Sequence, residues 1–176
     1  MDFETYLEEN GKPLAFAHGD HVFRQGDNDG ALYFIKSGIL KAYYIVDGGR
    51  EQVKSFLSSG TIIGSLTAAY AGEPNTFSLV CLEDTELVRF SFSGIRKLAR
   101  ENDSIAEGLT ERLLSLAMKK ERREYELLCL SAEERYRLLL ERSPELIARV
   151  AQQDIALYLG ITPVALSRIK KRMAVG

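Results

Sequence analysis

The sequence has few of the side chains that bind metals or form disulfides. Its 176 residues include two cysteines, Cys81 and Cys129, and two histidines, His18 and His21. Two distant cysteines without a Cys-x-x-Cys pair are too few for a disulfide scaffold or a thiolate metal site. His18 and His21 could chelate a metal in principle, but such a site needs further ligands, and there is no third histidine. We therefore expect no metal site and no enzyme, and interpret Cys81 as a small buried side chain.

Long apolar runs are also missing. None approaches the roughly 20 residues that a membrane-spanning helix needs, and the acidic, amphipathic N-terminus does not have the form of a signal peptide. We therefore expect a soluble, cytoplasmic protein without a membrane partner. A chain of this length can bury a core and form one or two domains.

The net charge of −2 gives no general reason to expect nucleic-acid binding, but the charge is unevenly distributed. Residues 1–103 contain 10 Lys and Arg against 15 Asp and Glu, whereas residues 104–176 contain 13 against 10. A basic second half is typical of a surface that meets a polyanion, and equally of a solvated helical surface with mixed charge.

Before residue 93 the pattern is that of short β-strands. Runs rich in β-branched and aromatic residues alternate with turn-forming residues, and Asp47-Gly48-Gly49 between two alternating runs is a strong hairpin signal. Strands are expected at residues 32–35, 39–46, 52–56, 77–82 and 86–91. This spacing predicts a closed or sandwiched antiparallel sheet, such as a jelly roll.

After Ser93 the pattern is helical. Ser93 can cap a short helix through residue 100, and residues 102–104 can cap a second helix over about 104–129, roughly 39 Å long at 1.5 Å per residue. Two apolar stripes follow this helix: Ile105, Leu109, Leu113 and Leu116 form the first, and Leu114, Met118, Tyr125 and Leu128 form the second. The first can pack on the β-domain. A second copy of the helix is the simplest cover for the other, which favours a symmetric dimer over a core helix with a polar, frayed end.

The last third of the chain predicts several short helices. Ser131 and Glu134 form a capping box that opens one helix, and Pro144 ends it or begins another. Residues 152–171 then have the spacing of a helix-turn-helix, with Gly160 in the tight turn. Thr162 is the expected N-cap of the second helix and Pro163 its first residue. The expected inner side chains are Ile155, Ala156, Leu159, Val164, Leu166 and Ile169.

The outer face of this second helix is basic. Ser167, Arg168, Lys170, Lys171 and Arg172 are left to meet a DNA groove or phosphates. The alternative is a plain helical hairpin that packs on its own core. The glycine, the Thr-Pro cap and the basic helix together favour DNA.

From about residue 16 to 171 the chain resembles the CRP/FNR family of bacterial transcription regulators. The segments HGDHVFRQGDNDGALYFIKSGILKAY, GTIIGSL, EDTELVRFS and LGITPVALSRIKK follow one another in the family's order. The resemblance implies an α+β fold in which an antiparallel β-roll, of the jelly-roll or double-stranded β-helix type, precedes a long dimerisation helix and a helix-turn-helix. The implied division is a sensor at 1–103, the dimerisation helix at 104–130 and the DNA-binding part at 131–176.

The family's effector pocket is altered in this sequence. In members that bind cyclic nucleotides, a Glu holds the ribose and an Arg holds the cyclic phosphate, and here these positions are Ser65 and Asn75. Because Asn cannot neutralise a phosphate, ordinary cAMP or cGMP is not expected. The pocket could be empty, filled by side chains, tuned to an uncharged ligand, or take a small anion at the helix start near Ser65. The candidate pocket residues are Gly64, Ser65, Leu66, Asn75, Thr76, Lys120 and Glu121.

Other sensors of the family do not fit either. An iron–sulfur member needs a cysteine cluster near the N-terminus and a haem member needs axial ligands, and neither set is present. We therefore expect no cofactor, and an unknown small molecule as the effector.

The resemblance also implies partners. A homodimer through residues 104–130 would bind a palindromic duplex operator, and RNA polymerase is a further candidate partner. The candidate DNA-binding residues are Gln152, Gln153, Thr162, Ser167, Arg168, Lys170 and Lys171. The first reading positions are Pro163 and Val164, so Arg168 is the main candidate for a guanine contact. The sequence ends soon after Lys171, so the family's C-terminal β-wing is expected to be missing or truncated.

The favoured function is therefore a DNA-binding transcription regulator. The alternative is a β-roll sensor or protein-interaction module with a degenerate DNA-binding part. A metalloenzyme is a distant third hypothesis, because no nucleophile or ligand set is visible.

Overall fold

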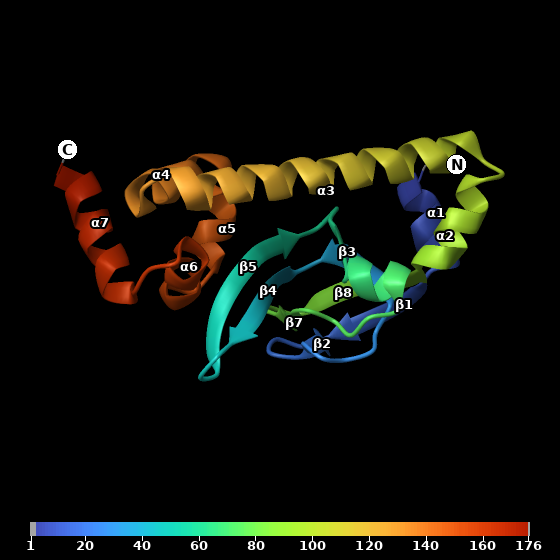
Figure 1. Cartoon of the computed structure of the whole chain (residues 1–176), viewed down its shortest axis with the longest axis horizontal. Coiled ribbons are helices and arrows are strands. Elements are labelled where there is room, and N and C mark those ends of the chain that lie inside the picture. Colours follow the sequence, from blue (N-terminus) through green and yellow to red (C-terminus); the bar gives the residue numbers. More distant parts are fainter. Residues whose placement is uncertain (1–2, 176) are drawn as a thin grey trace.

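Strands make up the first half of the molecule. The computed structural model describes residues 3–175, and in it two antiparallel sheets have the strand orders β1-β8-β3-β6 and β2-β7-β4-β5 (Figure 1). The strands are β1 Lys12–Phe16, β2 His21–Phe23, β3 Ala31–Ser37, β4 Ile39–Val46, β5 Arg50–Ser58, β6 Ile62–Ile63, β7 Ser78–Cys81 and β8 Thr85–Ser91. Buried side chains from both sheets form one core, so the sheets close on each other as a roll. The α+β fold class is thereby confirmed.

Five strands lie where the sequence predicts them, and three short strands were not predicted. The missed strands are β1, β2 and β6, of two to five residues. β1 contains Pro13, which reads as a strand breaker but is tolerated because β1 is an edge strand paired with β8 alone. Cys81 is 1% exposed in the core, and burial raises the pKa of its thiol, as expected for a structural cysteine.

The β4–β5 hairpin contains an irregularity that later bears on the site. Its turn has Gly48 and Gly49 at positive φ, as the Asp-Gly-Gly signal predicts. Ala42 pairs with Ser55 but the next residue, Tyr43, pairs with Val53. Lys54 is therefore the extra residue of a β-bulge, a device that turns a side chain away from the regular alternation.

Helices occupy the two ends and one long side of the molecule. They are α1 Phe3–Asn10, the single π-helical turn η1 Thr67–Ala71, α2 Phe92–Ala99, α3 Asp103–Cys129, α4 Ala132–Arg142, α5 Pro144–Arg149, α6 Gln152–Leu159 and α7 Pro163–Val175. In Figure 1, α3 runs along the whole roll, with α1 and α2 at one end and the four last helices at the other. None of the helices among residues 3–175 combines the length and apolar character needed to cross a membrane.

Most helix caps follow the sequence signals. Asn102 caps α3 by accepting from the Ile105 amide at 3.2 Å, and Ser131 and Glu134 form the expected capping box. Pro144 begins α5. The cap of α2 is a correction: Ser91, not Ser93, accepts from the Gly94 amide at 3.3 Å.

The first apolar stripe of α3 is buried only at its start. Ile105 is 1% exposed in a cluster with residues of α1, α2 and the roll, whereas Leu113 is 39% exposed. The expectation that the whole stripe packs is wrong for Leu113, because α1 and α2 cover only the first turns of α3.

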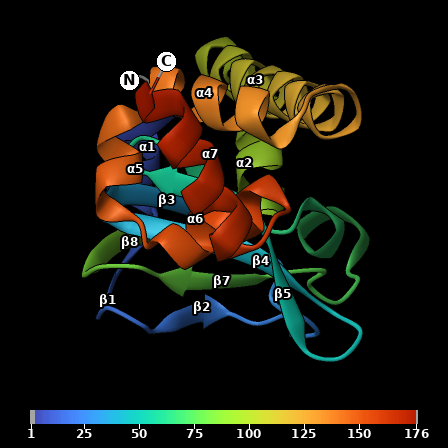
Figure 2. The same ribbon diagram turned by 90° about the vertical axis from the view of Figure 1, so that its left-hand side faces the viewer.

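The last four helices share a second core with the roll. Ile155, Ala156 and Leu159 of α6 have no exposed surface and join Tyr136, Ile147 and Leu166. Ile39, at the start of β4, belongs to the same cluster, so these helices pack against the roll of their own chain. Figure 2 shows α6 and α7 in front of the sheet edge.

Candidate effector pocket and DNA-binding element

The turn between β6 and η1 approaches the backbone of β3 closely. A Cβ atom on Gly64 would lie 2.5 Å from Leu32 Cδ2 and 2.7 Å from the Ala31 carbonyl oxygen, so only glycine fits. Ser65 follows, 2% exposed, with its Oγ 2.9 Å from Thr67 Oγ1 and 3.3 Å from the Ala68 amide. The Ala68 amide therefore already has an acceptor at the start of η1. Leu66 is half-buried.

The return from η1 to β7 contains a buried amide without partners. Asn75 is 2% exposed, and neither its Oδ1 nor its Nδ2 has a hydrogen-bond partner within the described chain. Its backbone is held firmly, since its N–H donates to Asp27 O and its carbonyl accepts from Gly26 N, both at 2.8 Å. An unpaired buried amide is costly. Thr76, the next residue, is exposed.

Lys54 is a neighbour of this region that sequence analysis missed. Its Nζ lies 4.9 Å from the centroid of the Phe77 ring, in a cation–π contact. Burial, and next the positive charge of Lys120, lower the pKa of Lys54 to about 8. The sequence shows Lys54 only as a lone lysine within the predicted strand 52–56. The bulge that alters the direction of its side chain depends on the pairing of β5 with β4.

We call residues 64–76 the cradle. The candidate residues on α3 are less closely joined to it. Lys120 and Glu121 are both exposed. Lys120 is near enough to act electrostatically on Lys54, so the structure brings it toward β5. Gly64 and Ser65 thus precede η1 and Asn75 follows it, all three on the roll, whereas Glu121 is exposed on α3. In the described range no cluster of three or more His, Cys, Asp and Glu side chains is arranged to hold a metal ion.

The C-terminal helices adopt helix-turn-helix geometry. Gly160 ends α6 with φ of 70°, and Thr162 Oγ1 accepts from the Ala165 amide at 3.2 Å to cap α7. Leu166 and Ile169 of α7 are buried as expected. Val164 was expected to be an inner anchor, and this is wrong: its side chain is 61% exposed, whereas Leu166 and Ile169 take the buried face of α7.

The basic residues of α7 lie on its outer face. Ser167, Arg168, Lys170 and Lys171 are exposed, as are Gln152 and Gln153 at the start of α6. Lys170 Nζ donates to Gln152 Oε1 at 2.9 Å, which ties the two helices together. Arg172 differs from the expectation, since its guanidinium pairs with Glu133 of α4 at 2.9 Å and so supports the packing of α7.

A family model described as "Cyclic nucleotide-binding domain" matches residues 13–102. The chain belongs to this domain family, as a regulator of the CRP/FNR type. The regulator is 27% identical over 184 residues to the "Transcriptional activator protein anr" of Pseudomonas aeruginosa, covering 98% of this chain and 73% of that one. It is 28% identical over 179 residues to the "Cyclic AMP receptor protein" of Thermus thermophilus, covering 98% and 77%. These relatives are regulators, which agrees with the expectation that the chain is not an enzyme.

Solved structures show the same fold. FixK2 from Bradyrhizobium japonicum superposes with a TM-score of 0.79 at 19% identity, over 94% of the regulator and 85% of FixK2. A CooA mutant from Carboxydothermus hydrogenoformans gives 0.77 at 16% identity, over 97% and 78%. At these identities the likeness supports the fold alone.

Proposed function

We propose that this regulator binds duplex DNA as a homodimer and responds to a small molecule other than ordinary cAMP. The observation that carries the DNA part is the two-sided character of α7. Its inner side chains, Leu166 and Ile169, are buried on α6, whereas Arg168 and Lys171 face outward without an ion-pair partner among residues 3–175. A fixed helix with a free basic face suits insertion into a major groove.

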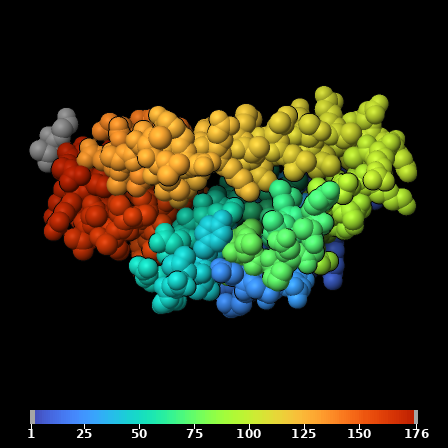
Figure 3. All heavy atoms as spheres, viewed as in Figure 1, coloured from blue at the N-terminus to red at the C-terminus, as the bar shows by residue number. Residues whose placement is uncertain are grey.

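The second apolar stripe of α3 supports the dimer. Leu114, Met118, Tyr125 and Leu128 are 58%, 50%, 58% and 77% exposed, and Figure 3 shows α3 as a continuous ridge along one side. Packing this stripe on its own copy would bury it around a two-fold axis. Such an axis would present the two α7 helices to the half-sites of a palindromic operator.

The sensor part rests on the charge of the cradle. Asn75 stands where cyclic-nucleotide-binding members have a phosphate-holding arginine, and an amide cannot neutralise that charge.

We propose the division into a sensor at 1–103, a dimerisation helix at 104–130 and a DNA-binding part at 131–176, with RNA polymerase as a further partner. In a thermal-shift assay, stabilisation by micromolar cAMP would contradict the sensor proposal.

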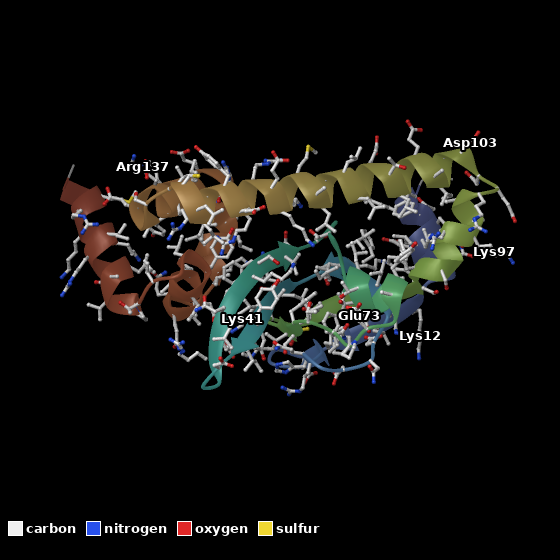
Figure 4. The ribbon with its side chains drawn as sticks, viewed as in Figure 1. Lys12, Lys41, Glu73, Lys97, Asp103 and Arg137 are labelled. Carbon is white, nitrogen blue, oxygen red and sulfur yellow. The ribbon has the colours of Figure 1, made fainter. Side chains whose placement is uncertain are left out.

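A gel-shift assay on the region upstream of the protein's own gene tests DNA binding. We expect Arg168→Ala to weaken binding to the preferred site by about ten- to a hundredfold, since a bidentate base contact contributes about 1–3 kcal/mol. Lys97→Ala removes an equal charge from an exposed position on α2, at the far end from α7 (Figure 4), and should bind as the wild type does. Absence of any sequence-dependent shift at low salt would instead favour a protein-interaction module.

A further inference from the structure

The ammonium group of Lys54 is partly buried, and no acidic side chain neutralises its charge. The bulge in β5 places it opposite no residue of β4, so its side chain leaves the regular alternation of the strand. The Phe77 ring, 4.9 Å from Nζ, is the contact that the structure records for this group. Among residues 3–175, no carboxylate pairs with it.

The surroundings of Lys54 make this arrangement unfavourable without an anion. Burial and the positive charge of Lys120 on α3 both disfavour the ammonium form and lower its pKa. Lys120 is the charged group recorded as acting on Lys54 from the facing helix, and Phe77 offers only an apolar ring. By contrast Lys41, on the neighbouring strand, has two carboxylates at 2.9 Å. Buried cations are normally paired in this way.

A second unpaired polar group belongs to the same region. Asn75 stands two residues before Phe77, with its side chain 2% exposed and both amide atoms without partners. Its Nδ2 can donate two hydrogen bonds and its Oδ1 can accept two, but the amide supplies no charge. Lys54 supplies the charge, and Phe77 links the two residues, since Lys54 lies over its ring and Asn75 precedes it by two residues.

We propose that Lys54 binds the anionic group, a carboxylate or a phosphate, of a small organic effector, with Asn75 as a neutral hydrogen-bonding partner. This inference depends on the proposed function, because it assigns a ligand to the candidate effector pocket. The anion completes the pairing that Lys54 lacks and offsets its repulsion by Lys120. It also explains how a pocket that has lost the phosphate-holding arginine can still hold a charged ligand.

The bulge is next to a junction that reaches the DNA-binding element. The carbonyl of Val53, the residue before Lys54, accepts from Arg123 Nη2 of α3 at 3.5 Å. The same guanidinium donates to the Tyr158 carbonyl of α6 and lies 3.7 Å from the centroid of the Tyr158 ring. An anion bound at Lys54 is therefore one residue away from a contact that joins β5, α3 and α6.

Titration calorimetry of the full chain without DNA tests the proposal, with benzoate and inorganic phosphate as probes. At pH 7 we expect one of them to bind the wild type, and Lys54→Met to bind it at least tenfold more weakly. Lys54→Arg should remain within about threefold of the wild type, because the charge is kept. Benzoate remains an anion above neutral pH, so its affinity should fall about tenfold between pH 7 and pH 9 as Lys54 loses its proton.

Lys12→Met is the matched control, because Lys12 is exposed on β1 in the other sheet (Figure 4). It should bind the probes as the wild type does. Benzoate binding alone would assign a carboxylate effector, and phosphate binding alone a phosphate. The proposal is wrong if neither probe binds at millimolar concentration or if Lys54→Met binds as tightly as the wild type. Gel shifts without probe keep the two proposals separate, since DNA binding can persist when anion binding fails.

Discussion

Asn75 and Lys54 are polar residues near Phe77 whose side chains have no hydrogen-bond or ion-pair partner among residues 3–175. Asn75 is a neutral amide held by two backbone hydrogen bonds to the loop at Gly26 and Asp27. Lys54 is a cation held by a bulge and an aromatic ring. The positive charge is thus carried by a strand rather than by the loop after η1, which alters the position from which an anion can be bound.

Gly64 positions the cradle by steric means, and this can be tested. Gly64→Ala would force a methyl group against the Ala31 carbonyl oxygen and Leu32, neither of which can move freely inside β3. We expect a loss of about 1–3 kcal/mol in the free energy of unfolding, measured by urea denaturation. Gly94→Ala is the control: its Cβ would be 3.7 Å from Ser91 Cβ within α2, so stability should be unchanged or raised by up to about 1 kcal/mol. Equal effects of the two substitutions would contradict the close approach.

At the scale of elements, α3 is a long helix with two different ends. Its first turns are buried against α1 and α2, and near its end Glu126, 9% exposed, pairs with Arg142 of α4. The side chains of the second apolar stripe, from Leu114 to Leu128, are 50–77% exposed in the part of the chain that the structure describes. A helix anchored at both ends can present this stripe in a defined direction, as a dimer interface requires.

A single acidic substitution on this stripe should prevent self-association. Leu128→Glu places a charge on the most exposed residue of the stripe, at 77%, where two copies would face each other. We expect sedimentation velocity to show monomer where the wild type shows dimer. Leu127→Glu makes the same change on the opposite face of α3, where Leu127 is 45% exposed, and should remain dimeric. A monomeric wild type, or dimers of Leu128→Glu, would contradict the assignment of the interface.

At the scale of the whole molecule, the helix-turn-helix formed by α6 and α7 is docked on the roll of its own chain. Lys41 of β4, 8% exposed, donates to Glu51 of β5 and Asp154 of α6, each at 2.9 Å, and lies on the part of the sheet toward the C-terminal helices (Figure 4). The rings of Phe56 and Tyr158 pack beside it, 5.4 Å apart. The position of α7 is therefore coupled to the hairpin that also contains Lys54.

Replacing Lys41 should loosen this docking. Lys41→Met keeps an unbranched side chain one atom shorter but leaves Glu51 and Asp154 facing each other without a cation, so we expect a loss of roughly 1–3 kcal/mol in urea unfolding and weaker operator binding. Lys36→Met breaks an ion pair with Glu8 whose side chains are 40% and 43% exposed, and should cost less than about 1 kcal/mol. Similar losses for both would contradict a special role for Lys41.

The pH dependence of the Lys41 contribution follows from its pKa. Burial opposes its charge, but the hydrogen bonds to Glu51 and Asp154 outweigh burial and raise its pKa above the ordinary value. A raised pKa stabilises the fold at all pH values below that of lysine in the unfolded chain, and the gain disappears as pH rises past the raised value. The difference between wild type and Lys41→Met should therefore be constant from pH 6 to 9 and shrink only in stronger alkali.

The order and type of most elements follow from local sequence patterns. Alternation and turn residues identified five of the eight strands, and the capping box at Ser131 and the Gly160 turn identified helix ends, because these signals act between residues close in the chain. The family resemblance placed Ser65 and Asn75 in the cradle. The short edge strands and the cap at Ser91 depend on pairing with distant strands, so local sequence patterns do not identify them.

The contacts between these elements depend on the folded structure. The bulge that aims Lys54 inward depends on its register with β4, the unpaired state of Asn75 depends on every neighbour around it, and the Lys41 ion pairs join residues 113 positions apart. Burial and pairing are properties of the surroundings, and no local sequence pattern specifies them. For this reason the kind of protein could be predicted from the sequence, whereas the candidate anion site and the docking of α6 could not.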